Sequence, residues 1–358
     1  MNGFWDFLIR PALEAAEARV VVEVGSEGGR HTRRLLDWCA ARRARLHVVD
    51  PEPLYDVAEL EAAHGERLVF HRAPSLEVLN RLGSMDAVLI DGDHNWFTVY
   101  SELKMLEATQ RRHFPLVVLH DVAWPFARRD MYYAPARIPA RYRRPYAQGG
   151  LRRGAAAFVE GDGLAPELYK AIEEGGPCNG VLTAVEDFLQ ETRLGLRFEV
   201  VPVDFGLGLI ASELLQENRP ALRSLLDSLR SPGFGERLLA YAEERRIEDL
   251  TGLQGETRRT REELVRVTAD LGRHQAELAR HEVEVKRLRD ELAALQRVRD
   301  EVAALQRQLH VERQEGESVR RELNAARDAL AHILDSRSWR FTAPLRRAGN
   351  VVRSWERA

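Results

Sequence analysis

Short apolar runs alternate with amphipathic segments over the first part of the chain. The runs are residues 19–24, 46–50, 68–71, 87–91 and 116–120, and the segments with helical spacing between them are 30–41, 57–63, 76–82 and 97–109. Strands that are apolar on both faces and alternate with helices are typical of a parallel sheet covered on both sides. We therefore predict an α/β, doubly wound domain over residues 1–215, completed by a helix at 180–190 and a hairpin of residues 196–203 and 206–211.

Beyond residue 255 the pattern changes to a repeat of seven residues. One line of apolar positions is Leu264, Leu271, Leu278, Val285 and Leu292, and a second line follows it three residues later, with His274 and His281 in its gap. This pattern predicts a coiled coil over residues 256–334, joined to the first domain by a helical linker, 216–255. Two similar segments ten residues apart predict a stammer, and Gly316 should weaken the helix. The regular seam favours a homo-oligomer, and the alternative is a single solvated helix.

Composition and charge narrow the class of protein. Of 358 residues, 53 are Lys or Arg and 56 are Asp or Glu, so the net charge of −3 argues against nucleic acid as a partner. The two cysteines, Cys39 and Cys178, lie far apart in the sequence, which excludes a disulfide scaffold. No apolar run approaches the ~20 residues that a membrane span needs. We expect a cytoplasmic protein without a signal peptide.

A glycine turn follows the first predicted strand. Glu23, Gly25, Ser26, Gly29 and Thr32 form the pattern E-x-G-x-x-x-G-x-x-T at the start of a helix. Glycines at this place let the backbone turn tightly and let a ligand approach it. A carboxylate two residues after Gly25 would repel a pyrophosphate, so the pattern favours a zwitterionic ligand with a sulphonium over a nicotinamide dinucleotide. The alternative is a strand-to-helix turn without a ligand.

Asp50 ends the second predicted strand, 25 positions after Gly25. A carboxylate there can accept both hydroxyls of an adenosine ribose, so we expect Asp50 to contact the cofactor. An ordinary acidic residue before Pro51 is the alternative.

Two neighbouring strand ends carry carboxylates and imidazoles. Asp91 and His94 follow the fourth strand, and His120 and Asp121 follow the fifth. Because ligands bind at the carboxyl edge of open α/β sheets, we expect these side chains to meet there. Asp91, His94 and Asp121 are the candidate catalytic residues, with His94 or a metal-bound oxygen handling the proton, and oxygen and imidazole ligands suit Mg²⁺ or another divalent cation. Polar caps of the following helices are the alternative.

An arginine- and tyrosine-rich segment, residues 124–153, is the candidate substrate cap. Arginines bind carboxylates or phosphates, and tyrosines stack on sugars. Because Arg128, Arg129, Tyr132 and Tyr133 lie closest to the Asp121 strand end, we expect them to contact an anionic acceptor. A solvated surface loop is the alternative.

Taken together, the glycine turn, Asp50, the IDGDH motif at 90–94 and the LHDV motif at 119–122 resemble class I S-adenosylmethionine-dependent methyltransferases. The type is that of the catechol, macrocin and sugar O-methyltransferases (methyltransferase domain family 24). The resemblance covers roughly residues 1–215 and implies a seven-stranded sheet with a final antiparallel strand. It also implies that Asp91, His120 and Asp121 form a metal triad, with His120 where the family has a carboxylate, and that Ser75 contacts the adenine.

The expected function is O-methylation of a sugar or glycan intermediate in surface polysaccharide biosynthesis. The alternative is a non-catalytic scaffold that recruits glycan-assembly enzymes through its coiled coil. The basic aromatic tail, 335–358, resembles tails that follow coiled coils in bacterial polysaccharide transferases. Such a tail can lie on the inner face of an anionic membrane, and a frayed helix end or docking peptide is its alternative.

Overall fold

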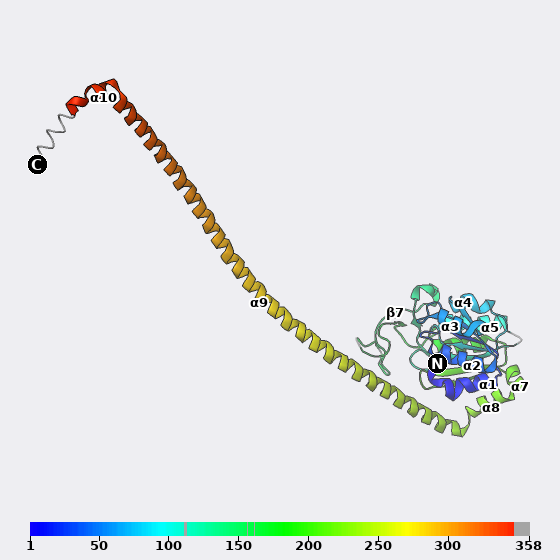
Figure 1. Cartoon of the computed structure of the whole chain (residues 1–358). Coiled ribbons are helices and arrows are strands. Elements are labelled where there is room, and N and C mark those ends of the chain that lie inside the picture. The colour runs from blue at the N-terminus through cyan, green and yellow to red at the C-terminus, as the bar shows by residue number, and fades with distance from the viewer. Residues whose placement is uncertain (111–112, 156, 161, 347–358) are drawn as a thin grey trace. The chain divides into compact units, whose positions relative to one another are not determined.

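The computed structural model describes residues 1–110, 113–155, 157–160 and 162–346. These residues form two compact units, Met1–Gln254 and Gly255–Ala358. Figure 1 labels most of the helices.

The first unit is built on a seven-stranded sheet in the order β3-β2-β1-β4-β5-β10-β9. Strands β1 to β5 are parallel, and β10 runs antiparallel to both β5 and β9. The bounds are β1 Val20–Val24, β2 Arg45–Val49, β3 Leu68–His71, β4 Ala87–Ile90, β5 Leu116–His120, β9 Leu196–Val201 and β10 Leu207–Ser212. The doubly wound sheet and its closing antiparallel strand are thus confirmed.

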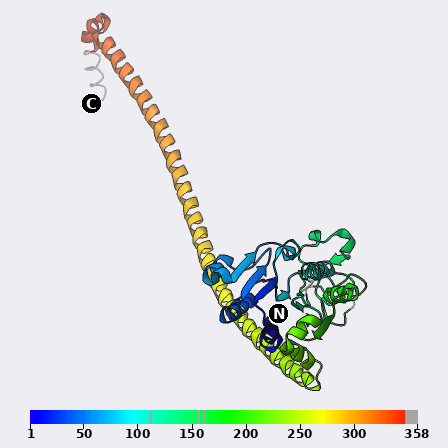
Figure 2. The same ribbon diagram turned by 90° about the vertical axis from the view of Figure 1, so that its right-hand side faces the viewer.

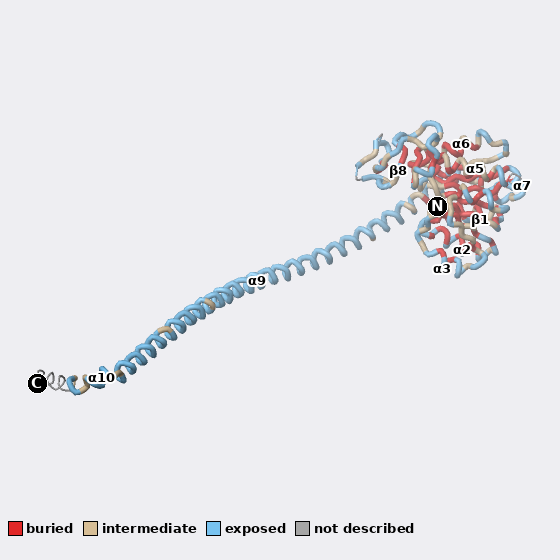
Figure 3. The backbone as a smooth tube through the Cα atoms, turned by 90° about the horizontal axis from the view of Figure 1, so that it is seen from above, coloured by how far each residue is buried: buried red, intermediate tan, exposed pale blue. Residues whose placement is uncertain are grey.

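Helices cover both faces of this sheet. One apolar cluster joins α1, α2 and α8 to one face, and another joins α4, α5 and α6 to the other. The bounds are α1 Arg10–Ala15, α2 Arg30–Arg42, α3 Val57–His64, α4 Ser75–Val78, α5 Trp96–Thr109, α6 Val181–Glu191, α7 Glu213–Asn218 and α8 Pro220–Ser228. Figure 3 shows the buried residues concentrated in this unit.

Side-chain caps fix where two of these helices begin. The Asp56 carboxylate accepts a hydrogen bond from the Ala58 amide at the start of α3, and the Asn95 side chain accepts one from the Thr98 amide at the start of α5. Such caps satisfy amide groups that have no partner within the helix. The cap at Asn95 fixes α5 directly after the loop that carries Asp91 and His94.

The segment expected to be a helical linker, 216–255, contributes to the core of the first unit. Leu222 and Leu226 on α8 are fully buried, and Phe234 and Tyr241 are nearly so. The last two lie at the start of α9 (Pro232–Asp335), where Tyr241 stacks on Phe7 with ring centroids 4.4 Å apart. Residues 216–254 comprise the end of α7, α8 and the start of α9, with breaks at Arg219 and at 229–231, and they pack against the N-terminal segment.

The segment between β5 and α6 forms a small second sheet, in the order β6-β8-β7. Its strands are β6 Met131–Tyr132, β7 Tyr146–Ala147 and β8 Tyr169–Ala171, and all are antiparallel. We refer to the described residues of 124–180 as the cap.

Helix α9 is a single helix of 104 residues that continues through Gly316 (Figure 1 and Figure 2). A short helix, α10 (Arg337–Phe341), follows it, and the tail residues from 347 onward lie outside the described part of the chain. Among the described residues, no helix is both long and apolar enough to cross a membrane.

Candidate active site

The loop after β1 lies against the end of β4. Gly25 has a φ of +84°, and a Cβ atom at this position would lie 2.3 Å from the Asp91 carbonyl oxygen. Because such an approach is impossible for any other residue, Gly25 brings the turn into contact with the Asp91 backbone. The strands β1 and β4 flank the point where the strand order reverses, which is where open α/β sheets bind ligands.

Glu23 and Thr32 interact with each other below the turn. Glu23 is 2% exposed, and its carboxylate accepts a hydrogen bond from the Thr32 hydroxyl at 2.7 Å. The other carboxylate oxygen lies 2.9 Å from Nδ1 of His31. Both residues were expected to bind the cofactor, and in this structure their side chains join the end of β1 to the start of α2.

Asp50 lies at the end of β2 and holds the glycine turn in place. Its Oδ2 accepts hydrogen bonds from the Ser26 amide at 2.8 Å, the Ser26 hydroxyl at 2.7 Å and the Glu27 amide at 3.1 Å. Its Oδ1 accepts one from the Glu52 amide at 2.8 Å. Three donors fill Oδ2, so Oδ1 is the atom left with capacity for a ribose hydroxyl.

Ser75, at the start of α4, is paired with a buried carboxyl group. Its hydroxyl donates to Oε1 of Glu102 on α5, and both residues lie in the interior. Burial raises the pKa of Glu102 to about 8, the Ser75 hydrogen bond lowers it, and Asp93 raises it. Glu102 is therefore largely protonated at neutral pH, and the sequence analysis did not single it out.

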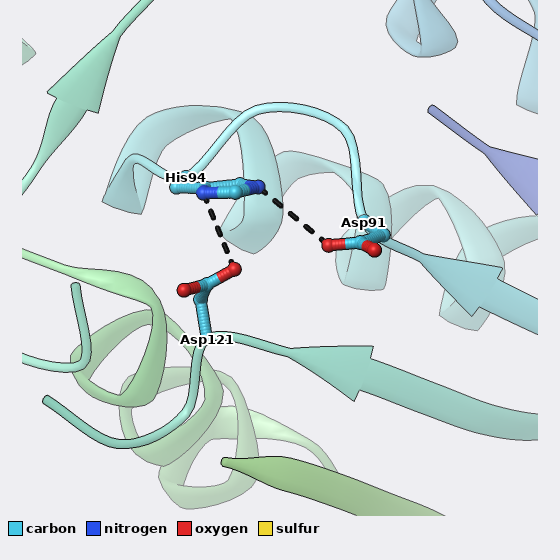
Figure 4. A group of neighbouring side chains, drawn as sticks. All are labelled: Asp91, His94 and Asp121. Atoms are coloured by element: carbon cyan, nitrogen blue, oxygen red, sulfur yellow. Dashed lines mark ion pairs between the residues drawn. The ribbon is translucent and has the colours of Figure 1, made fainter. Parts of the chain in front are cut away.

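Asp91, His94 and Asp121 converge at the carboxyl edge of β4 and β5, as predicted. Figure 4 shows the His94 ring between the two carboxylates. Nδ1 of His94 lies 3.3 Å from Oδ2 of Asp121, and Nε2 lies 3.7 Å from Oδ1 of Asp91. Within the part of the chain that the structure describes, neither ring nitrogen makes a hydrogen bond, although both are buried. Buried polar atoms without partners mark a place where a proton, a water molecule or a ligand is needed.

The backbone at Asp121 is in an unusual conformation. Asp121 has a φ of +62° and is 3% exposed. A left-handed conformation of a residue other than glycine costs free energy, and such residues cluster at functional sites. Here it accompanies the carboxylate that faces His94.

His120 balances the charge of the two carboxylates. Its Nδ1 lies 3.2 Å from Oδ1 of Asp91 and 2.9 Å from Oδ2 of Asp121. Burial lowers the pKa of His120, but the carboxylates of Asp91 and Asp121 outweigh this effect and raise the pKa to about 10. His120 is therefore a cation at neutral pH, and a protonated imidazole cannot bind a metal through that nitrogen.

These contacts make His94, and not His120, the imidazole of the candidate metal group. Ligand atoms of Asp91, His94 and Asp121 all lie within 4.8 Å of one another. The resemblance implied His120 as the third ligand, whereas the structure places His94 in this position and pairs His120 with the carboxylates. Two carboxylates and a neutral imidazole are a donor set that fits a divalent cation.

A positive charge already lies beside Asp91. The terminal ammonium of Met1 is 2.9 Å from Oδ2 of this residue. Burial raises the pKa of Asp91, but His120, the ammonium and His94 outweigh it and hold the pKa well below its usual range. The two carboxylates of the site are thus matched by two positive groups, His120 and the Met1 ammonium.

The two predicted substrate arginines of the cap contact other groups of the protein. Arg128 forms a two-point contact with Glu186 on α6, with Nη2 donating to Oε1 at 2.7 Å. Arg129 is 4% exposed and donates to the carbonyl oxygens of Ala171 and Ile172. Both guanidinium groups therefore help to fasten the cap, and their contact with an anionic acceptor stays a prediction.

The two predicted substrate tyrosines differ in their burial and in their position relative to His94. Tyr132 is buried, and its hydroxyl donates to Asp130 at 2.8 Å, so its expected contact with substrate stays a prediction that this structure does not favour. Tyr133 is 57% exposed, and its ring meets His94 edge-on at 6.1 Å between centroids. Of the four predicted substrate residues, Tyr133 is the one beside the candidate site.

A further buried residue fixes the cap to the main sheet. Asp130 accepts hydrogen bonds from the Trp96 amide and the Gly180 amide, each at 2.7 Å. It thereby connects the cap to the first residues of α5 and α6. No sequence motif marked this residue, because its partners are backbone groups far along the chain.

The order and content of these elements agree with one protein family. Residues 22–122 match a family model described as a methyltransferase domain. The matched stretch contains the glycine turn, Asp50, and the His94 cluster. It supports S-adenosylmethionine-dependent methyl transfer as the chemistry of this domain. A comparison with curated proteins finds no match.

Several solved methyltransferase structures are similar to part of the chain. The methyltransferase PaMTH1 of Podospora anserina, bound to S-adenosylhomocysteine, is 15% identical, with 59% of this chain and 78% of that chain covered and a TM-score of 0.37. The 1,6-didemethyltoxoflavin-N1-methyltransferase of Burkholderia thailandensis is 17% identical, with 59% and 84% covered and a TM-score of 0.32. The CcbJ methyltransferase of Streptomyces caelestis is 16% identical, with 59% and 89% covered and a TM-score of 0.33. The functional interpretation therefore rests on the family match and the site geometry.

Proposed function

We propose that this chain is an S-adenosylmethionine-dependent O-methyltransferase that acts on a sugar or glycan intermediate, as in surface polysaccharide biosynthesis. The observation that carries the proposal is the position of His94. Its ring lies between Asp91 and Asp121, at the sheet edge that the glycine turn also reaches. A base, two carboxylates and a cofactor turn are therefore gathered at one point.

The glycine turn and Asp91 fit the cofactor. Gly25 lets the turn pack against the Asp91 backbone, so the turn and the Asp91 side chain lie close together, and a carboxylate at this place suits a positively charged group. When bound, S-adenosylmethionine supplies the methyl group: the acceptor oxygen bonds to the methyl carbon as the carbon–sulphur bond breaks, and the sulphonium becomes a neutral thioether.

The two histidines have different roles in this reaction. His94 is the general base, because neither of its ring nitrogens makes a hydrogen bond to any described residue and it can take the proton of the acceptor hydroxyl. His120 remains protonated and keeps the two carboxylates in place. If Asp91, His94 and Asp121 held a divalent cation, the cation would lower the pKa of the acceptor hydroxyl, and His94, as its ligand, would no longer serve as the base.

Exposed aromatic rings support a sugar as the acceptor. Tyr133 lies beside His94, and Tyr146 and Tyr169 on the cap sheet are each about two-fifths exposed. Flat aromatic rings are the surfaces on which sugar rings pack. The acceptor specificity would then come from these rings and not from the Arg128–Arg129 pair.

The cytoplasm is the proposed location, since both cysteines are free thiols. Contact of the tail with an anionic membrane is a further part of this proposal. Phe341 is 89% exposed and Leu345 is 75% exposed, while Trp355 and the arginines at 347, 353 and 357 lie outside the described residues.

Calorimetric titration with S-adenosylmethionine tests the cofactor. We expect the wild type to bind it and Asp50→Ala to bind it more weakly, because this change releases the glycine turn. Asp56→Ala is the matched control, since it removes a helix-capping carboxylate from the same connection. Equal affinities of wild type and Asp50→Ala would refute the role of Asp50, and binding of NAD instead would refute the cofactor assignment. A wild type that binds neither would favour a non-catalytic scaffold.

Transfer of a radiolabelled methyl group tests the acceptor. UDP-glucose and catechol are offered separately, and the product is treated with mild alkali. A sugar methyl ether resists alkali, whereas a methyl ester is cleaved. Label on catechol alone, or label lost in alkali, would contradict O-methylation of a sugar hydroxyl without affecting the cofactor assignment.

A further inference from the structure

The apolar residues of α9 in the second unit are exposed. Leu271, Leu278 and Leu295 are 56%, 63% and 66% exposed, and Figure 3 shows the helix exposed along most of its length. Burying such side chains stabilises a structure by roughly 1.5–3 kcal/mol each. A regular stripe of this kind needs a covering partner.

The stripe extends from Leu264 to Ile333 with one shift. The second line runs from Val267 through Leu295 and on to Leu330 in steps of seven, and it is apolar except at His274, His281 and Gly316. The first line ends at Leu292, and a new line begins at Val298 and is apolar except at Glu312. The spacing from Leu288 to Val298 is ten residues, so the stripe shifts once, and it resumes at Val319 after Glu312 and Gly316.

One flank of the stripe is acidic. Each repeat of seven residues has a first and a second position in the stripe. We call the positions directly before the first one the acidic flank. Up to the shift these positions are Glu263, Asp270, Glu277, Glu284 and Glu291. Beyond the shift, Glu301, Glu315 and Glu322 continue the same flank, and Gln308 is its uncharged member.

The opposite flank is mainly basic. We call the positions directly after the second stripe position of each repeat the basic flank. It carries Arg289, Arg299, Arg313, Arg320 and Arg327. Its other positions in the same span are uncharged, except for Glu282.

We propose that the stripe is covered by the same stripe of a second copy of this chain, parallel and in register. In a parallel pair the acidic flank of one helix faces the basic flank of the other, five residues further on. Glu284, Glu315 and Glu322 then lie beside the partner's Arg289, the partner's Arg320 and the partner's Arg327. Glu277 opposite the partner's Glu282 is the one unfavourable pair.

An antiparallel pair has the opposite consequence. It places acidic flank against acidic flank along the whole stripe, and basic flank against basic flank. Repulsion between like charges at these positions disfavours the antiparallel orientation, even though each single contact is weak. The segregation of charge therefore selects the parallel orientation.

Four charged residues near the end of the stripe have few opposite charges close by on their own helix. The residues three and four positions away from Glu315, Glu322 and Arg327 carry no opposite charge, and Arg320 has only Glu317, three positions before it. Among the described residues, none of these four takes part in an ion pair of the single chain. A second copy supplies the opposite charges that the single helix lacks.

Site-directed cross-linking in the full chain tests the orientation. Cys178 is replaced by Ser, Cys39 is buried, and Leu264→Cys places one thiol in the stripe. We expect oxidation to give a covalent dimer, because equivalent core positions meet only in a parallel, in-register pair. Ala269→Cys, on the outer face of the same helix, is the matched control. Failure of Leu264→Cys to cross-link, or equal cross-linking of both variants, would overturn the proposal.

Charge reversal tests the flanks. Glu315→Arg with Glu322→Arg should raise the dissociation constant, measured by sedimentation equilibrium, by roughly ten- to a hundredfold. Adding Arg320→Glu and Arg327→Glu should restore it. Glu317→Arg with Asp328→Arg makes the same change in net charge away from both flanks and should have little effect. A monomeric wild type, or no rescue by the fourfold variant, would exclude the parallel pair, and neither result depends on the catalytic activity.

Discussion

The buried carboxyl group of Glu102 gives the stability of the first unit a distinctive pH dependence. Glu102 is fully buried on α5. Among the described residues, its Oε1 accepts a hydrogen bond from the Ser75 hydroxyl, and its Oε2 has no hydrogen-bond partner. The proposed change is Glu102→Gln. Glutamine has nearly the shape of a protonated glutamic acid, but it cannot become charged.

The size of the effect follows from the pKa. Burial raises the pKa of Glu102 from 4.5 to about 8, a difference of about 3.5 pH units. At about 1.36 kcal/mol per pH unit, this corresponds to on the order of 5 kcal/mol. Between these two values the folded state keeps a proton that the unfolded chain has lost. The free energy of unfolding of the wild type therefore falls as the pH rises through this window, and it is constant with respect to this group outside it.

Urea unfolding at a series of pH values, followed by tryptophan fluorescence, measures this difference. Four of the six tryptophans, Trp5, Trp38, Trp96 and Trp124, lie in the first unit. We expect similar stability of wild type and Glu102→Gln near pH 5, and a variant that is more stable by several kcal/mol near pH 9. Glu61→Gln, which changes an exposed glutamate on α3, is the control. Stability curves of wild type and Glu102→Gln that stay parallel from pH 5 to pH 9 would refute the reasoning.

Two further predictions concern the site and the cap. Mg²⁺ or Mn²⁺ should raise the thermal unfolding midpoint of the wild type but not that of Asp121→Asn. The reason is that the substitution removes a negatively charged ligand from the group of Asp91, His94 and Asp121. A wild type whose midpoint responds to neither ion would contradict a metal site. Arg129→Met should destabilise the first unit by roughly 2–4 kcal/mol in urea unfolding, since two buried carbonyl groups lose their donor; unchanged stability would show that water replaces the guanidinium.

The main sheet could be predicted because its signals are local. Strands β3 and β5 have the bounds that the apolar runs indicate, and the helix that begins at Arg30 follows directly from the glycine turn. The N-terminal helices and the start of α9 were not recognised as one packed layer. Their contacts, such as Phe7 on Tyr241, join residues more than two hundred positions apart, and periodicity carries no information about such pairs.

The sequence predicted where the candidate site lies, but not which role each of its residues has. The positions of Asp91, His94 and Asp121 follow from parallel strands ending at one edge of the sheet. Which imidazole faces which carboxylate depends on loop conformation, including the left-handed backbone at Asp121. The charge of His120 depends on burial and on two neighbouring carboxylates, so the sequence could not separate the base from the counter-ion.

The cap shows why a count of charged residues misleads about specificity. Its buried apolar cluster is small, with Phe126, Met131 and Leu151 at its centre. A segment with so little apolar core must be held by polar contacts, and Arg129, Asp130 and Lys170 are the buried groups that provide them. Arg129 is placed for this purpose, because its guanidinium donates to backbone carbonyl groups of the cap. The side chains that remain available beside His94 are aromatic, so recognition of the acceptor would depend more on stacking than on charge and should respond only weakly to salt.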